Sequence, residues 1–562
     1  MRKLLPVFLI LLFSTVLFAV GPVAKYVVFL KDKNNNPYSL SNPSVFLSQR
    51  ALDRRARYWI GLDMKDLPVT PSYVSQVRAT GAGVVYSLKW FNAVVVETDN
   101  QSALAAIAAL PFVDHIDQVL TKNTASSSKG QGVKQVEEIP LCTFSKPIPF
   151  YTSGDSSVFN YGQATNQTHM IAVDLLHNKG YTGLGIWIAI LDAGFCHADQ
   201  VSAFDSLWDN NRILGTRDFN LPGNNVFADT MHTHGTAVLS TMGANLPGQI
   251  VGTAPHASFW LIRTEVGWYE APVEEYNWAA GAEFADSVGA DIINSSLGYT
   301  TFNDSVFNHT YSDMNGNTTP VTRAADLASS RGMIVVNSAG NDGGSAWHYI
   351  SAPADGDSVL AIGAVNSQGV YASFSSTGPS ADGRIKPDVS AQGAGTTVVA
   401  ANGSVVQGSG TSFSSPIMAG AMACLWQAMP ETSAEDLRNA VRKTASQFNA
   451  PDSLMGFGIP NMMNALTLLS VNSIQPDGKK PYTLYPVPFS DSPWLRSNLN
   501  QSETVKIDVL SIAGQLVYSQ NINIAGSSAI KLNSFNTLPP GLYLVRIATG
   551  SRLQMIRAVK YE

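Results

Sequence analysis

Short apolar runs that alternate with helix-like segments fill residues 185–469 and constrain the fold of this chain more than any other feature. The runs GIWIAIL, SFWLIR, DIIN, MIVVN and SVLAIGAV suit strands that are buried on both faces. Between them stand the helix candidates THGTAVLSTMGA, VEEYNWAAGAEFADSVGA and TRAADLASSRG. This alternation predicts an α/β fold with a mainly parallel sheet and helices on both faces. Reactive groups in such folds gather at the carboxyl ends of the strands.

The whole chain has 562 residues, which is too long for one core, because single cores stop growing at about 250–300 residues. Its net charge is only −6, and no long Lys/Arg run appears. Nucleic-acid binding and attraction to an acidic membrane are therefore not expected.

The N-terminus carries two basic residues before an apolar run over residues 4–18. The run is too short to cross a bilayer, so residues 1–19 are predicted to be a secretory signal peptide, cut near Ala19 or Ala24. No other segment is long and apolar enough for a stable membrane span.

Residues 26–118 have a periodicity of their own and predict a small α+β unit. KYVVFLKD and AVVVETD are its strand candidates, and NQSALAAIAAL is a helix candidate. SVFLSQRALDRRARYW is expected to form a second helix whose Arg-rich side faces solvent. Residues 121–160 follow without a sustained period and predict a linker that is open to proteolytic processing.

The last segment, residues 480–562, has a different pattern from the α/β region before it. After a Pro-rich start it contains the alternating runs TVKIDVLSI, QLVYSQ, SAIKL, LYLVRIA and LQMIRAV, which are separated by Gly- and Pro-containing turns. It is predicted to be a small all-β sandwich domain.

Three cysteines are too few and too scattered for a disulfide scaffold or a zinc site. Cys424 lies in an apolar helical run and is expected to be a small core residue. Cys142 and Cys196 either pair in an oxidising compartment or stay unpaired. His232, two residues before His234, is interpreted as a polar loop residue, because a lone His-x-His pair is weak evidence for a metal.

The stretch GSGTSFSSP, residues 408–416, holds the strongest candidate nucleophile. Proline is tolerated only in the first turn of a helix, so the helix through IMAGAMACLW begins shortly before Pro416. That places Ser412 at a helix N-terminus, where it is either a cap or a reactive group. Ser409, Ser414 and Ser415 are expected to be loop or first-turn polar residues.

A serine needs a base to take its proton and an acid to orient that base. Asp192 closes the buried run GIWIAIL, and His234 opens a predicted helix. The order Asp192, His234, Ser412 along the chain is one of the known orders of a catalytic triad.

These blocks resemble the signatures of subtilisin-like serine peptidases: ILDAGF around Asp192, HGT at 234–236 and GTSFSSP at 410–416. NSSLG at 294–298, NSAGN at 337–341 and GRIKPDVSAQG at 383–393 extend the resemblance, which covers residues 161–470. It implies a subtilisin-like peptidase domain and hydrolysis of protein or peptide substrates through an acyl-enzyme.

The resemblance also implies a role for each matching residue. Ser412 attacks the scissile carbonyl, His234 transfers the proton, and Asp192 orients the imidazole, while Asn341 donates to the oxyanion. The segments that pair with substrate and wall its pocket are Ser296, Leu297, Gly298 and Ser338, Ala339, Gly340. The family commonly has Ser or Thr where this chain has Ala193, and activity is expected to survive that change. The chemistry implied by the resemblance requires no cofactor. Family members often bind structural calcium. No Asp-rich loop in this chain fixes such a site, so no metal ligand is assigned.

The flanking segments extend the resemblance. Residues 26–118 resemble the propeptides of secreted subtilisin-like enzymes, which aid folding and inhibit their own enzyme. The blocks YPVPF, IDVLSIAGQLVY and PGLYLVRI in residues 480–562 look like the type IX secretion sorting domain of Bacteroidota. That implies contact with the secretion machinery and a location outside the outer membrane, either released or attached to the surface.

Two other functions compete with a secreted peptidase. One is a catalytically idle surface protein that binds peptides or glycans, although a binding module has no need of Asp192, His234, Ser412 and Asn341 together. The other is an esterase-type hydrolase, which usually shows a G-x-S-x-G elbow with the histidine last in the chain. A sedolisin-type peptidase is excluded by HGT at 234–236, because that family replaces the histidine with a glutamate.

Overall fold

A computed structural model describes residues 23–121, 158–472 and 481–561, apart from positions 59, 229, 268, 500, 512–514 and 550–552. The predicted signal peptide, most of the predicted linker and Cys142 lie outside the described residues. Within the described part, no helix combines the length and the apolar character that crossing a membrane requires.

A seven-stranded sheet forms the centre of the middle domain, in the order β13-β12-β11-β10-β5-β9-β6. Every neighbouring pair is parallel, which confirms the predicted sheet. Its strands are β5 (Trp187–Asp192), β6 (Ile213–Asp218), β9 (Ser258–Arg263), β10 (Ile292–Ser295), β11 (Ile334–Ser338), β12 (Val359–Val365) and β13 (Val389–Gln392). The edge strands β6 and β13 were not predicted, because they lack the long apolar runs of the inner strands.

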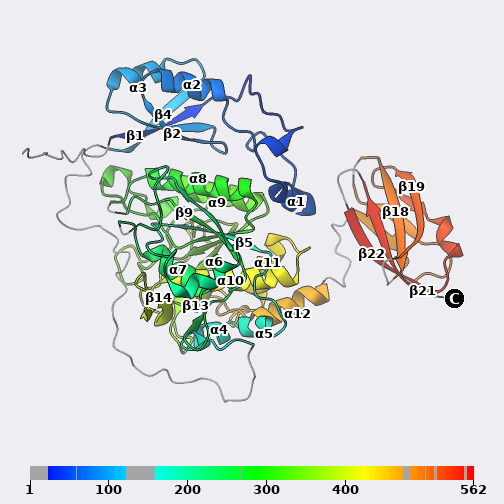
Figure 1. Ribbon diagram of the computed structural model, residues 1–562. Helices are drawn as coiled ribbons and strands as arrows, with labels where there is room; N and C mark the ends of the chain where they lie inside the picture. The colour runs from blue at the N-terminus through cyan, green and yellow to red at the C-terminus, as the bar shows by residue number, and fades with distance from the viewer. Residues whose placement is uncertain are drawn as a thin grey trace, which may run out of the picture.

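Helices cover both faces of this sheet (Figure 1), and successive strand residues point to opposite cores. Ile188 and Ile190 of β5 pack into the core that contains the long buried helix α10. Ala189 and Leu191 pack into the core beneath α8 and α9. Burial on both sides explains why the strand reads as one continuous apolar run.

The helices of this domain begin and end as follows: α4 (Thr165–His169), α5 (Val173–His177), α6 (Asp205–Asp209), α7 (His234–Gly243), α8 (Val273–Val288), α9 (Pro320–Ser330), α10 (Thr411–Ala428), α11 (Ala434–Lys443) and α12 (Met462–Asn472). Two short hairpins complete it: β7 (Asn245–Leu246) with β8 (Ile250–Val251), and β14 (Thr396–Val399) with β15 (Val405–Gly408). Cys424 on α10 is fully buried, as expected of a core residue.

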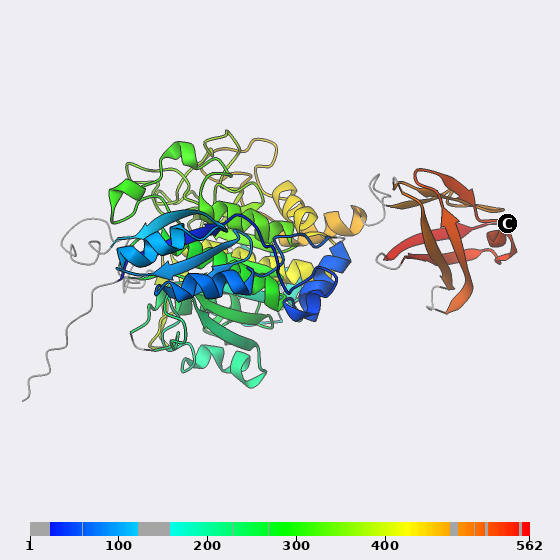
Figure 2. The same cartoon turned by 90° about the horizontal axis from the view of Figure 1, so that it is seen from above.

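The N-terminal unit is an antiparallel sheet in the order β2-β3-β1-β4. It contains β1 (Lys25–Leu30), α1 (Gln49–Tyr58), α2 (Pro71–Ala79), β2 (Gly83–Leu88), β3 (Ala93–Glu97), α3 (Gln101–Ala108) and β4 (Val113–Leu120). The sequence predicted only two strands and two helices for this unit. Strands β2 and β4 were missed because they carry many exposed positions. The sheet lies over α8 and α9 (Figures 1 and 2), and its Val27, Leu88 and Trp90 join the core beneath it.

Helix α1 corrects a second prediction, because its Arg-rich side is buried against the middle domain. Arg54 and Arg55 are only 4% and 2% exposed. Both contact Asp286 near the end of α8, at 2.7 Å and 2.9 Å, and Lys89 Nζ lies 3.2 Å from the same carboxylate. Although burial alone would raise the pKa of Asp286, Lys89, Arg55 and Arg54 hold it below its ordinary value. The sequence showed a polar helix face but not the carboxylate that covers it.

The C-terminal domain is all-β, as predicted, and has two antiparallel sheets in the orders β16-β17-β20 and β19-β18-β21-β22. Its strands are β16 (Tyr482–Tyr485), β17 (Trp494–Ser497), β18 (Glu503–Ser511), β19 (Leu516–Ile524), β20 (Ala529–Lys531), β21 (Gly541–Ala548) and β22 (Leu553–Lys560). Side chains from both sheets share one apolar core, which includes Leu495 and Val545.

Candidate active site

Asp192 and His234 form the best-defined pair at the carboxyl ends of the parallel strands. Asp192 is the last residue of β5 and fully buried, and His234 is the first residue of α7 and 8% exposed. His234 Nδ1 lies 2.9 Å from Oδ1 and 3.0 Å from Oδ2 of Asp192. A carboxylate at this position keeps the proton on Nδ1, so Nε2 is the nitrogen that can accept one.

Backbone contacts hold this pair in place. The Ala193 N–H donates to Asp192 Oδ1 at 2.7 Å, and the Thr264 N–H donates to the Asp192 carbonyl at 3.0 Å. The Gly235 N–H donates to the Gly194 carbonyl at 3.0 Å. A Cβ on Gly235 would lie 2.4 Å from that carbonyl oxygen, so the glycine of the HGT block is required for α7 to approach β5.

Ser412 is the second residue of α10 and is half-buried. Its hydroxyl donates to the Ser296 carbonyl at 3.3 Å, and the Ser296 hydroxyl donates to the Ser412 carbonyl at 3.0 Å. The ring of Phe413, the next residue, lies 6.1 Å from the His234 ring between centroids. The start of α10 is thus fixed between the end of β10 and the histidine.

The other serines of this stretch have the structural roles that were expected. The Ser409 hydroxyl accepts from the Gly395 N–H at 3.1 Å. The Ser414 hydroxyl donates to the Thr411 carbonyl at 3.1 Å, within the first turn of α10. The Ser415 hydroxyl donates to Asn294 Oδ1 at 3.2 Å and ties α10 to β10.

Asn341 follows β11 and is oriented by Thr411, a residue that the sequence analysis did not single out. The backbone N–H and the hydroxyl of Thr411 both donate to Asn341 Oδ1, at 2.8 Å and 2.9 Å. A Cβ on Gly410 would lie 3.4 Å from Asn341 Nδ2 and 3.7 Å from Ser412 N. The amide of Asn341 and the backbone N–H of Ser412 therefore lie near each other, beside Gly410.

The two predicted substrate segments also end neighbouring strands. Ser296, Leu297 and Gly298 follow β10, while Ser338, the last residue of β11, precedes Ala339 and Gly340. The Asn337 amide donates to the Leu297 carbonyl at 3.0 Å and holds the two segments together. The Ser296 hydroxyl holds the Ser412 carbonyl, and the expected contact of residues 296–298 with substrate stays a prediction.

Comparison with known proteins identifies the family. Over 303 residues the chain is 31% identical to "Subtilisin DY" of Bacillus licheniformis, covering 52% of this chain and 95% of that protein. The chain belongs to the subtilase family. The model of that family, "Subtilase family", matches residues 183–458. "Subtilisin E" of Bacillus subtilis (strain 168) is 29% identical over 304 residues, which are 53% of this chain and 71% of the relative.

Family models also match both flanks of this subtilase. "Peptidase S8 propeptide domain, Bacteroidota" matches residues 25–135, and "Secretion system C-terminal sorting domain" matches residues 483–560. The protein is therefore a serine endopeptidase made with a propeptide. Its type IX sorting domain indicates export to the cell surface or the medium.

His232 behaves as the polar loop residue that was expected. Its Nδ1 accepts from the His234 N–H at 3.2 Å, within the loop that leads into α7 of the subtilase. Burial, and then the neighbouring His234, lower the pKa of His232.

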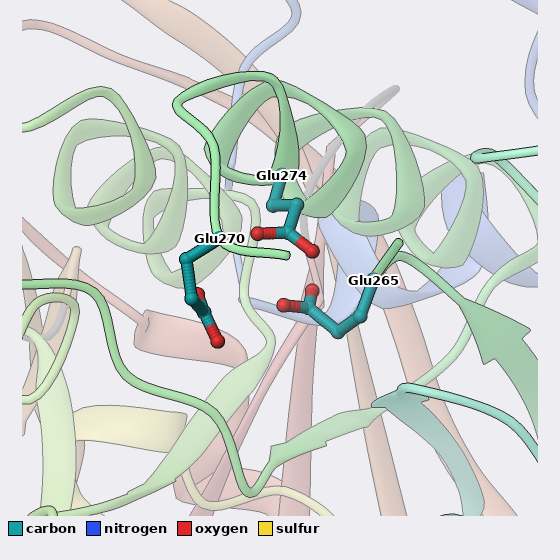
Figure 3. Close-up of side chains that lie close together, drawn as sticks. All are labelled: Glu265, Glu270 and Glu274. Atoms are coloured by element: carbon teal, nitrogen blue, oxygen red, sulfur yellow. The ribbon is translucent and has the colours of Figure 1, made fainter. Parts of the chain in front are cut away.

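Three carboxylates, Glu265, Glu270 and Glu274, lie together beyond the end of β9 (Figure 3), each offering an oxygen within 4.8 Å of the others. Tyr299 and Thr264 donate hydroxyls to Glu265, at 2.7 Å and 2.8 Å. Glu274 accepts the backbone N–H groups of residues 266 and 271, at 2.7 Å and 3.0 Å. Protein donors thus satisfy two of the three side chains, and we assign no metal to the cluster.

This cluster predicts a pH-dependent stability. Burial, followed by the charge of Glu270, raises the pKa of Glu265 from 4.5 to about 8. The unfolded chain loses this proton near pH 4.5, so the contribution of Glu265 is complete below that pH and is lost as the pH rises to about 8. We expect Glu265→Gln, in a Ser412→Ala background that prevents self-digestion, to reduce this loss by at least about 1 kcal/mol. Urea unfolding at pH 5 and pH 8 measures the free energy of unfolding of each protein. An equal fall in that free energy between the two pH values in both proteins would contradict the prediction.

Proposed function

We propose that this subtilase hydrolyses peptide bonds with Ser412 as nucleophile, His234 as general base and acid, and Asp192 as the group that orients His234. The observation that carries this assignment is the contact of His234 Nδ1 with both oxygens of buried Asp192. That contact leaves Nε2 as the proton acceptor. Ser412 lies in the first turn of α10, next to Phe413, and the Phe413 ring lies 6.1 Å from the His234 ring, which supports Ser412 as the proton donor.

In the proposed reaction, Ser412 Oγ attacks the scissile carbonyl carbon while its proton moves to His234 Nε2. The tetrahedral intermediate collapses as the imidazolium protonates the leaving amine, which leaves an acyl group on Ser412. Water then repeats the sequence with His234 again as base, and the acid product leaves. The hydroxyl must turn from the Ser296 carbonyl, 3.3 Å away, toward His234, an adjustment that substrate binding is expected to bring about.

We assign the oxyanion site to Asn341 Nδ2 and the Ser412 backbone N–H. Thr411 occupies Asn341 Oδ1 with two donors, which supports an outward direction for the Nδ2 group. Donors fixed in this way stabilise the developing charge without reorganising during the reaction. Residues 296–298 and 338–340 are proposed to pair with an extended substrate backbone.

The family matches on both flanks support a precursor that loses a signal peptide and a propeptide. We propose a signal peptide at 1–19, a propeptide at 26–118 that covers α8 and α9, and cleavage within 121–160. The peptidase domain at 161–470 is then active, and the sorting domain at 480–562 directs export. The wide contact of the propeptide with the peptidase core supports its role as an intramolecular inhibitor.

Casein hydrolysis tests this function. The protein is incubated until its propeptide is removed and is compared with a Ser412→Ala variant whose propeptide is removed by an added protease that is then inactivated. We expect the unaltered protein to cleave casein and the variant to lose at least about 10⁴-fold in kcat. Hydrolysis by the variant at the original rate would contradict the assignment, and inactivity of both proteins would favour the idle scaffold.

A further inference from the structure

Helix α1 of the propeptide lies beside the end of α8 (Figure 1), on a part of the peptidase domain that is remote from Ser412. This part is formed by the end of α8 and by the segments that lead into β5 and β10. The candidate active site lies where these two parallel strands end. Strand β5 has six residues, so about 16 Å separate its first residue, Trp187, from its last, Asp192.

Two adjacent arginines of α1 are bound by oxygen atoms of the peptidase domain. Arg54 donates to Asp286 Oδ1 at 2.7 Å and to the Asp286 carbonyl at 3.4 Å. It also donates to the carbonyls of Ala290 and Arg331, the latter at 3.1 Å. Arg55 donates to Asp286 Oδ2 at 2.9 Å. A carboxylate and three carbonyl groups of the peptidase domain therefore surround these two guanidinium groups.

A third arginine, one turn earlier on α1, has similar partners. Arg50 Nε donates to the Gly289 carbonyl at 3.0 Å, and Nη2 donates to the Gly185 carbonyl at 2.7 Å and to the Asp291 carboxylate. Its guanidinium also lies over the Trp187 ring, 4.4 Å from the centroid. A planar guanidinium can both stack on an aromatic ring and donate several hydrogen bonds, which a lysine ammonium cannot do. The site is therefore suited to arginine.

The peptidase fold holds these acceptors in place without help from the propeptide. Several are carbonyls at the C-terminus of α8, where a helix carries partial negative charge and lacks internal donors. Gly289 caps α8 with a φ of 91°, and a Cβ there would lie 2.7 Å from Arg50 Cβ, so this glycine also lets α1 approach. The Trp187 N–H donates to Asp291 Oδ2 at 2.9 Å and orients that carboxylate. Loss of the propeptide thus leaves a preorganised acidic surface.

We propose that the processed peptidase uses this surface as an exosite that binds arginine-rich helical segments of other proteins, with arginines at positions i, i+4 and i+5. That spacing is the one of Arg50, Arg54 and Arg55 in α1. The inference goes beyond the proposed function and depends on it only for the removal of the propeptide. Because the exosite lies where β5 and β10 begin, a helix bound there tethers its protein to the peptidase and leaves Ser412 accessible.

The test uses Ser412→Ala protein whose propeptide has been digested by an added protease and removed by gel filtration. Fluorescence anisotropy measures the binding of two labelled peptides: residues 46–66 of this chain, and an unrelated alanine-rich helix with arginines at i, i+4 and i+5. We expect both peptides to bind. Glutamine in place of the arginines at i+4 and i+5 should weaken the binding of each by at least about 30-fold.

Arg57→Gln in the first peptide is the matched control. In the precursor Arg57 lies 4.0 Å from the exposed Glu431, so its replacement should change binding by less than about fivefold. In the protein, Asp286→Asn should weaken the binding of both peptides by at least about 30-fold, whereas Glu431→Gln should have less than about a fivefold effect. The peptide substitutions leave the protein unaltered, so they report on the site even if Asp286→Asn disturbs the fold.

Processed protein whose active site is blocked by a fluorophosphonate should bind both peptides as tightly as Ser412→Ala does. Loss of binding in the blocked protein would place the peptides in the active site and overturn the proposal. Equal binding of the arginine and glutamine peptides would overturn it as well. Binding of the first peptide but not of the alanine-rich helix would show that the surface recognises only its own propeptide, which also contradicts an exosite. Casein hydrolysis reports separately on the proposed function, so the two failures are distinguishable.

Discussion

Replacing Asp192 by Asn is expected to lower kcat by about 10⁴-fold with little change in fold. An amide has nearly the shape of the carboxylate, but its NH₂ group favours the wrong tautomer of His234 and cannot stabilise the imidazolium. Both oxygens of Asp192 lie within 3.0 Å of His234 Nδ1, so either orientation of the amide is affected. Steady-state hydrolysis of a peptide anilide by processed protein measures the change.

Asp174→Asn is the matched control, because it alters another buried aspartate that contacts a histidine. Asp174 Oδ2 lies 2.6 Å from His169 Nδ1, and Asp174 is 6% exposed. This pair belongs to α4 and α5, outside the proposed machinery. We expect kcat to stay within about threefold of the original. A similar loss of kcat in both variants would indicate general damage to the fold and would contradict the proposed role of Asp192.

Replacing Asp286 by Asn is expected to speed release of the cleaved propeptide by about 10²–10⁴-fold. Arg54, Arg55 and Lys89 of the propeptide all contact this one carboxylate of the peptidase domain. Loss of one partner from a buried ionic cluster costs about 3–5 kcal/mol, since the remaining charges stay buried, and each 1.4 kcal/mol is about tenfold. Gel filtration after processing, and the lag before casein hydrolysis begins, measure the release.

Glu431→Gln provides the comparison at the same interface. Glu431 is paired with Arg57 of α1 at 4.0 Å, and the two side chains are 83% and 46% exposed. Exposed pairs contribute about 0–1 kcal/mol, so the release rate should change by less than about fivefold. Unchanged release in Asp286→Asn, or equal effects of both substitutions, would show that α1 does not anchor the propeptide.

The sequence predicted the parallel sheet because its inner strands are buried on both faces and appear as uninterrupted apolar runs. The edge strand β6 has two exposed and three half-buried positions, and its sequence ILGTRD gives no such signal. The buried face of α1 could not be predicted for a different reason. Its Arg pair is neutralised by Asp286, which lies more than 230 residues later in the chain.

The proposed reacting groups of the candidate site could be predicted from the sequence because motif blocks carry them together with their glycines. The groups that orient them could not, because each acts across a long separation in the chain. Thr411 fixes Asn341 from 70 residues away, and Ser296 holds Ser412 across 116 residues.

Mapping the attachment site of a fluorophosphonate probe tests the central assignment most directly. We expect processed protein to carry the probe on Ser412, as located by mass spectrometry of its peptides. Ser412→Ala should not be labelled, and labelling of His234→Ala should be strongly reduced, because the hydroxyl then lacks its base. A probe found on another serine, or equal labelling of Ser412→Ala, would contradict the assignment of Ser412 as the nucleophile.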